Sequence, residues 1–352
     1  MRETRQQEAV QAYFDSVDGR TIINACPRFG KIKVAIDIMK RMRMEYPAII
    51  APRVDIEAGW KKDFEKFGYK GHYAFYTTRS VHKIPDRTHD LYILDELHEF
   101  SLPQQEKLSK KIPESMGILG LTGTITQKTR QKLYDNLGLD VCYKYSIDQG
   151  VEEGILADYQ IFVHQVDLQG SEKRRFSSLD YVYEESKHTN FFVMLKMINL
   201  IQNSVSKRAK TQQLIEQAGN ERVLVFCGTT EIADNFGIPV YHSKAKEKDI
   251  FNAFCTGEGD KLATIKMMQA GITITPIRKG IINYMSGNPE DCAQKICRFL
   301  GFEYDSPDKK AEIHIVSSTE PFELTRLKTG LSFFNKSKIE YLCAYTQNQE
   351  SK

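Results

Sequence analysis

The sequence has no apolar run long enough to cross a membrane, since a spanning helix needs about 18 consecutive apolar residues. Its seven cysteines are odd in number and include no CxxC pair, which argues against disulfides and zinc and favours reduced thiols. The first ten residues, MRETRQQEAV, are charged throughout and do not resemble a secretory signal. We therefore expect a cytoplasmic protein with no membrane contact.

A strong net charge is also lacking. The formal charge is only +3, so a site for a polyanion must be a local patch rather than a property of the whole surface. The 352 residues are enough for two domains of ordinary size, and 41% hydrophobic with 27% charged residues is a globular composition.

Residues 21–33, TIINACPRFGKIK, predict a strand, a phosphate loop and the start of a helix. Such a loop turns backbone N–H groups and the positive end of the helix toward phosphates. Gly30 lets the backbone approach the ligand, and Lys31 supplies a charge for the outer phosphates. Ile32 stands where a Ser or Thr hydroxyl usually ligates Mg²⁺, so taken alone the stretch also allows a purely structural strand–turn–helix.

Residues 91–94 predict an apolar strand that runs directly into Asp95 and Glu96. Acids at the carboxyl end of a parallel strand lie where α/β sheets bind ligands. One carboxylate can hold Mg²⁺ while the other orients and deprotonates an attacking water. The alternative is that the two acids only cap the next helix. Residues 117–124 predict another buried strand, which ends in Thr122, Gly123 and Thr124.

Taken together and in order, these stretches resemble the superfamily-two helicases, and particularly the compact DExH members of bacteriophages akin to the UvsW-type recombination helicases. Gln6 resembles the adenine-reading glutamine, with Gln7 the alternative one register on. Residues 95–98, DELH, resemble the DExH box, and the helix carrying Gln294 and Arg298 resembles motif VI. The resemblance implies an α/β fold of two tandem RecA-like domains, each a mostly parallel sheet flanked by helices, with a nucleotide cleft between them.

The implied organisation is an ATP-binding RecA-like domain at 1–150, a linker at 151–158 and a RecA-like helicase domain at 159–352. A helical insertion is expected at about 169–215, and two helices are expected around 321–345.

The resemblance also implies residue roles, with ATP and Mg²⁺ as cofactors. The catalytic set is Lys31, Asp95 (which also holds Mg²⁺), Glu96 and Arg298. The nucleotide-binding set is Gln6, Ala25, Cys26, Pro27, Arg28, Phe29, Gly30, Lys31, Ile32 and Gly271. The nucleic-acid-binding set is Pro52, Arg53, Thr77, Thr78, His242 and Lys244. The coupling set is His98, Thr122, Gly123, Thr124 and Gln294.

The expected activity is that of an ATP-dependent helicase or translocase in phage replication, recombination or repair, which binds nucleic acid without sequence preference and DNA in preference to RNA. Two groups of the expected site are altered: Ile32 lacks the hydroxyl, and Gly301 stands at the second arginine of motif VI. They motivate an alternative, a helicase-shaped nucleic-acid-binding scaffold that has lost turnover. A small-molecule kinase is a third hypothesis, but it does not account for the DExH box.

Overall fold

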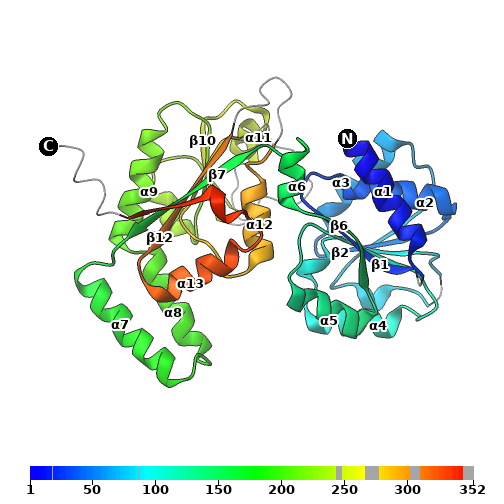
Figure 1. Ribbon diagram of the computed structural model, residues 1–352, viewed down its shortest axis with the longest axis horizontal. Coiled ribbons are helices and arrows are strands. Elements are labelled where there is room, and N and C mark those ends of the chain that lie inside the picture. Colours follow the sequence, from blue (N-terminus) through cyan, green and yellow to red (C-terminus); the bar gives the residue numbers. More distant parts are fainter. Residues whose placement is uncertain (18, 87, 243–247, 266–276, 302–309, 344–352) are drawn as a thin grey trace. The chain divides into compact units, whose positions relative to one another are not determined.

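The computed structural model describes residues 1–17, 19–86, 88–242, 248–265, 277–301 and 310–343 (Figure 1). The chain divides into two compact units between Leu156 and Ala157, inside the stretch predicted as the linker. None of the helices in these ranges combines the length and apolar character needed to cross a membrane. Lys244 and Gly271, two of the predicted site residues, lie outside the described residues.

The first unit is a six-stranded parallel sheet in the order β3-β2-β4-β5-β1-β6. Its strands are β1 (Arg20–Ala25), β2 (Ala48–Ala51), β3 (Ala74–Thr77), β4 (Tyr92–Leu94), β5 (Ile118–Thr122) and β6 (Asp140–Tyr145). Its helices are α1 (Arg2–Asp15), α2 (Lys31–Met42), α3 (Ile56–Phe67), η1 (Val81–Lys83), η2 (Leu97–Glu99), α4 (Leu102–Lys111), α5 (Gln127–Leu137) and α6 (Ile147–Glu152).

Helices cover both faces of this sheet, with α1 and α2 on one side and α4 and α5 on the other (Figure 1). The central strands are therefore buried on both faces, which explains why β2, β4 and β5 are continuous apolar runs rather than alternating ones.

The second unit is a seven-stranded sheet in the order β13-β7-β12-β11-β8-β10-β9, and all its pairs are parallel. Its strands are β7 (Tyr159–Val166), β8 (Val223–Phe226), β9 (Val240–Tyr241), β10 (Lys261–Thr264), β11 (Lys279–Ile282), β12 (Ala311–Ser318) and β13 (Ile339–Cys343). Its helices are α7 (Gly170–Glu185), α8 (Phe191–Gln202), α9 (Val205–Gln217), α10 (Thr230–Asp234), α11 (Lys248–Thr256), α12 (Pro289–Cys297), α13 (Pro321–Gly330) and η3 (Lys336–Lys338). Two parallel sheets flanked by helices are the predicted fold class.

The stretch predicted as a helical insertion, 169–215, contains two different kinds of helix. α7 and α8 pack against each other around Phe176 and Met197. α9 instead packs on β7, β11 and β12 and so belongs to the layer that covers the sheet.

The expectation of two helices around 321–345 is wrong for the second helix. α13 is present, but residues 339–343 form β13, which pairs with β7 over Ile161–Gln165. Five residues are too few for periodicity to separate a helix from a strand, and the open edge of β7 supplies the hydrogen bonds that select the strand.

Two histidines form a pair inside the second sheet. His164 Nε2 on β7 lies 3.0 Å from His314 Nδ1 on β12, and the His314 ring stacks on Phe162. Burial is the main reason that the pKa of His164 is lowered to about 3 and that of His314 to about 4. The folded protein therefore holds both rings neutral at pH values where the unfolded chain is protonated.

We expect the free energy of unfolding to fall as the pH drops below about 6.5, the pKa of histidine in the unfolded chain. Below this pH the two histidines bind protons in the unfolded chain but stay neutral in the folded protein. Between pH 7 and pH 5, the urea concentration at the midpoint of unfolding should decrease less in the double variant His164→Gln/His314→Gln than in the wild type. His188→Gln, at a histidine whose side chain is 57% exposed in the same unit, is the control. An identical pH dependence in wild type and double variant would contradict this account.

Candidate functional site

Apart from Gln6 on α1, the site residues predicted in the first unit lie at or just after the carboxyl ends of β1 to β5. The phosphate loop follows β1, Asp95 and Glu96 follow β4, and Thr122 to Thr124 close β5. Because these strands are parallel neighbours, the loop after β1 and the acids after β4 flank β5 at one edge of the sheet.

The phosphate loop turns sharply into α2. Arg28 (φ +66°) and Gly30 (φ +93°) both adopt the left-handed conformation, and Gly30 is the N-cap of α2. The positive φ favours glycine at position 30, and a Cβ there would lie 2.4 Å from Nε2 of Gln6 and displace that amide. Gln6 Nε2 in turn donates to the Phe29 carbonyl at 2.7 Å. The predicted adenine reader is therefore in direct contact with the predicted phosphate loop.

Lys31 is the first residue of α2, and its Nζ donates to the Ala25 carbonyl at 3.3 Å. Gly123 lies beside it, since a Cβ at this position would be 3.9 Å from Lys31 Nζ and 3.6 Å from Pro27 Cγ. A larger residue at Gly123 would fill the space next to the lysine charge.

Asp95 is buried, and each of its two carboxylate oxygens accepts a hydrogen bond from an N–H group. Trp60 Nε1 on α3 donates to Asp95 Oδ2 at 2.8 Å, and the Glu96 N–H donates to Oδ1 at 2.9 Å. Burial, and next the neighbouring Glu96, raise the pKa of Asp95 to about 7, while the Trp60 bond and the Lys31 charge oppose the shift. A carboxylate perturbed in this way beside a phosphate loop is typical of a functional site.

Glu96 adopts a left-handed conformation (φ +50°), which is unfavourable for a residue with a side chain. Backbone strain of this kind concentrates at functional sites, where the surrounding structure holds it in place. Arg28 and Glu96 are both strained, and both lie in loops at the site edge of the sheet.

The predicted coupling residues of the first unit are joined by hydrogen bonds. His98 Nδ1 lies 3.0 Å from Thr122 Oγ1, and Thr122 Oγ1 lies 3.4 Å from the Thr124 carbonyl oxygen. Glu96 Oε2 is 3.7 Å from His98 Nδ1. A continuous chain of contacts therefore connects the acid after β4 with the end of β5.

The predicted nucleic-acid residues of the first unit follow β2 and β3, on the far side of β4 from the phosphate loop. Arg53 Nη1 is paired with Glu99 Oε2 at 2.8 Å, so a phosphate there must compete with this carboxylate. Thr78 Oγ1 accepts from Gln104, and Ser80 Oγ accepts from the Thr77 N–H. Pro52 follows β2 in the same loop as Arg53.

The remaining predicted residues belong to the second unit. Gln294 lies in α12, Arg298 is its C-cap residue, and both side chains are half-buried. His242 follows β9.

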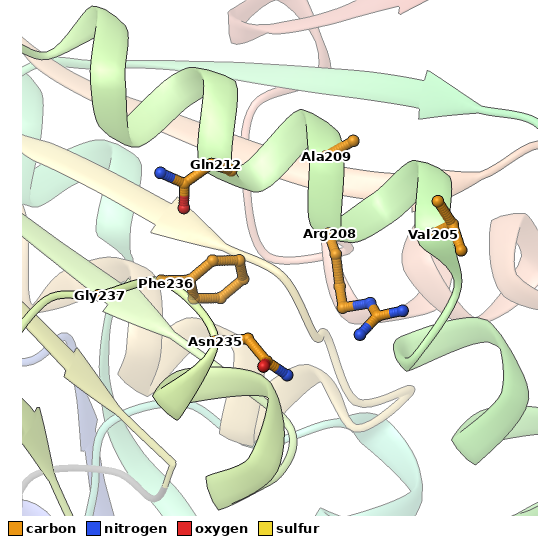
Figure 2. Close-up of a pocket in the computed structure, with 7 residues that line it drawn as sticks. All are labelled: Val205, Arg208, Ala209, Gln212, Asn235, Phe236 and Gly237. Carbon is orange, nitrogen blue, oxygen red and sulfur yellow. The ribbon is translucent and has the colours of Figure 1, made fainter.

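A groove of about 540 Å³ in the second unit runs between α9 and residues 235–237, lined by Arg208, Gln212 and Phe236 among others (Figure 2). It contains none of the predicted site residues.

The residues after β4 fit a magnesium ion. Mg²⁺ prefers oxygen ligands and in phosphate-transfer sites is held by one or two carboxylates together with phosphates and water. Asp95 offers such a carboxylate, and its burial makes neutralisation by a cation favourable. Asp95 would hold the ion with Glu96 beside it. Ile32 contributes no oxygen.

Comparisons with known proteins agree with this architecture, although no protein-family model matches the chain. The chain is 23% identical over 345 residues to the DNA 3'-5' translocase XPB2 of Sulfurisphaera tokodaii, covering 84% of this chain and 77% of that protein. It is similar in structure to a variant of Saccharomyces cerevisiae Dbp5 bound to RNA and ADP BeF3, with a TM-score of 0.65, 11% identity and coverage of 97% and 89%. It is also similar to the Pyrococcus furiosus Hef helicase domain, with a TM-score of 0.51, 14% identity and coverage of 93% and 96%.

The chain thus has two parallel sheets flanked by helices that match tandem RecA-like domains, and the predicted fold class is confirmed in this respect. The bacteriophage type and the DExH subtype are not settled by these likenesses and stay predictions.

The sequence did not indicate that Trp60 contacts Asp95, because the tryptophan simply continued the apolar face of α3. The available signal was chemical, since a buried indole N–H almost always needs an acceptor.

We expect Trp60→Phe to weaken magnesium binding by about tenfold, the usual cost of removing a group that orients a metal ligand. The measurement is the Mg²⁺ concentration that gives half of the thermal stabilisation by a non-hydrolysable ATP analogue. Phe64→Leu, next to the Trp60 ring at 5.6 Å, controls for lost packing. A magnesium requirement unchanged in Trp60→Phe would refute the orienting role.

Proposed function

We propose that this protein is an ATP-dependent nucleic-acid helicase or translocase that acts on DNA in phage replication, recombination or repair, in the cytoplasm of the host cell. The observation that carries the proposal is the arrangement around β5: Lys31 on one side and the Asp95–Glu96 pair on the other, at one edge of a parallel sheet.

In the proposed reaction, Gln6 binds adenine, while the backbone of residues 27–31 and the Lys31 ammonium bind the phosphates. Glu96 accepts a proton from a water molecule whose oxygen attacks the γ-phosphorus, and the bond to the β–γ bridging oxygen breaks with its electrons leaving on ADP. Asp95 would hold a magnesium ion, which when bound would supply positive charge opposite the phosphates. Arg298 is proposed to contact the γ-phosphate, a role assigned by motif resemblance.

The contact chain from Glu96 through His98 to Thr122 gives the acid a physical link to the end of β5. We propose that Thr122, Gly123, Thr124 and Gln294 use this kind of link to couple hydrolysis to movement along the strand.

Nucleic acid is proposed to bind through its phosphates at Pro52, Arg53, Thr77, Thr78, His242 and Lys244, without reading sequence. The DNA assignment is supported by the relative named as a DNA translocase, while the similar Dbp5 structure contains RNA. Gly271 completes the proposed nucleotide contacts.

A second candidate is a helicase-shaped scaffold that binds nucleic acid without turnover. Ile32 removes the usual magnesium hydroxyl, and Gly301 removes an arginine whose counterpart in GTPases is worth about 10³–10⁵ in rate. Water can replace the hydroxyl, because Mg²⁺ keeps several waters in most sites. The retained acid pair and lysine favour the enzyme.

ATP hydrolysis stimulated by nucleic acid tests the enzyme directly. We expect turnover in the presence of single-stranded, duplex or branched DNA, and a loss of about 10²–10⁴-fold in Glu96→Gln because the proton acceptor is removed. Lys31→Ala should lose ATP binding as well as turnover. The same assay with RNA of equal length tests the DNA preference. Wild-type rates no higher than those of the two variants would favour the scaffold.

Salt dependence tests the phosphate contacts. Affinity for oligonucleotides of unrelated sequence should be similar and should fall steeply with salt. Arg53→Ala should weaken binding to all of them equally and reduce the slope of log K against log salt by about 1. Lys61→Ala, at an exposed lysine of α3, should leave the slope unchanged. A sequence-selective loss in Arg53→Ala would argue against phosphate binding there.

A further inference from the structure

The chain leaves the first unit through residues 145–156, here called the exit segment, which run from the end of β6 through α6 to the division at Leu156. This segment is attached to the phosphate loop. The Cys26 N–H donates to the Tyr145 carbonyl at 2.9 Å, and the Tyr145 ring lies 5.1 Å from the Phe29 ring. A Cβ on Gly150 would lie 3.0 Å from Cys26 Sγ, so α6 packs directly on the loop.

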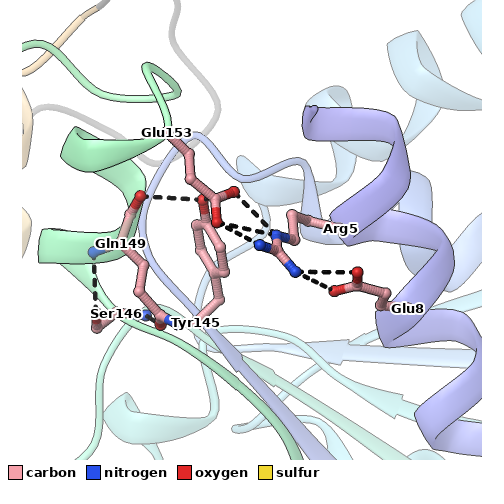
Figure 3. A network of polar contacts seen from close by, with 6 residues as sticks. All are labelled: Arg5, Glu8, Tyr145, Ser146, Gln149 and Glu153. Carbon is pink, nitrogen blue, oxygen red and sulfur yellow. Dashed lines mark hydrogen bonds and ion pairs between the residues drawn. The ribbon is translucent and has the colours of Figure 1, made fainter.

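The same segment holds the first turn of α1, which has no side-chain cap of its own. The Arg5 guanidinium binds the Glu153 carboxylate through Nη2 to Oε1 at 2.6 Å and through Nε to Oε2 at 2.9 Å (Figure 3). Glu153 Oε2 also accepts from the Tyr145 hydroxyl at 2.8 Å. Arg2 Nη2 adds a longer bond to the Ile155 carbonyl at 3.3 Å.

Gln6 is the next residue after Arg5, and this residue is only 7% exposed. Its hydrogen bond to the Phe29 carbonyl closes a ring of contacts that runs Arg5, Glu153, Tyr145, Phe29, Gln6. Every member of this ring belongs to the first unit. An uncapped helix turn frays easily, and the ion pair between Arg5 and Glu153 ties this turn of α1 to the exit segment.

We propose that Arg5 and Glu153 are positioning residues for Gln6, so that selectivity for adenine nucleotides is set by the exit segment. This inference rests on the proposed function, which makes Gln6 the adenine reader. Since the exit segment continues directly into the second unit at Ala157, a displacement of the segment would move the first turn of α1 and change adenine recognition.

The chain supplies a matched control, because the same guanidinium also binds Glu8 through Nη1 at 2.9 Å (Figure 3). Glu8 lies on α1 itself, and its side chain is 43% exposed against 17% for Glu153. Glu153→Gln weakens the tie to the exit segment with almost no change in shape, whereas Glu8→Gln leaves that tie intact.

The experiment measures the dissociation constants of Mg·ATP and Mg·GTP by calorimetry for the full chain and both variants. We expect Glu153→Gln to bind ATP about fivefold more weakly with GTP unchanged, because one charge-assisted pair is weakened and only adenine is read by Gln6. Glu8→Gln should keep the wild-type ratio of the ATP and GTP dissociation constants. Arg5→Lys retains the charge without the two-nitrogen geometry, so its ratio should lie between those of Glu8→Gln and Glu153→Gln.

The inference would be overturned if the ratio of the ATP and GTP dissociation constants in Glu153→Gln and Arg5→Lys equalled that of the wild type. Equal losses of both nucleotides would also overturn it, because they would indicate a structural role only. A wild-type protein that binds ATP and GTP equally would instead refute adenine reading by Gln6, and this result is visible without any variant.

Discussion

Parallel pairing of the six strands in the first sheet is the constraint on which the site depends. A parallel strand can only be followed by a crossover, so each strand of such a sheet delivers its next residues to one edge. This places the loop after β1 and the acids after β4 on opposite sides of β5. Lys31 is far in sequence from the adjacent Asp95 and Glu96, yet the sheet order alone brings it to the same edge as this pair.

The site edge of the sheet contains a buried acid and strained loops, features that lower stability and are typical of functional sites. The Asp95 carboxylate is only 5% exposed and accepts hydrogen bonds from the Trp60 side-chain N–H and the Glu96 backbone N–H. Arg28 and Glu96 keep strained backbone conformations in the adjoining loops. A buried acid, a lysine and strained loops are expected where a polyanion and a cation bind together.

The sequence predicted those features that depend on local pattern. Short apolar runs followed by a glycine-containing loop or an acid pair located β1 and β4 with the candidate site residues after them. The fold class came from the family resemblance that these stretches carry together. The sequence-based prediction failed where the pairing partner decides the secondary structure. Residues 339–343 form β13 because the open edge of β7 accepts another strand. The prediction also missed contacts between distant residues, since nothing in the neighbourhood of Arg5 points to Glu153.

The central claim is that the edge around β5 binds the phosphates of ATP together with a divalent cation. A crystal structure of the full chain with a non-hydrolysable ATP analogue and Mn²⁺, an anomalous scatterer that replaces Mg²⁺, tests it most directly. The account predicts the γ-phosphate at Lys31 and the backbone of residues 27–31, with the Mn²⁺ peak beside Asp95. Nucleotide bound elsewhere, or a metal peak away from Asp95, would contradict it.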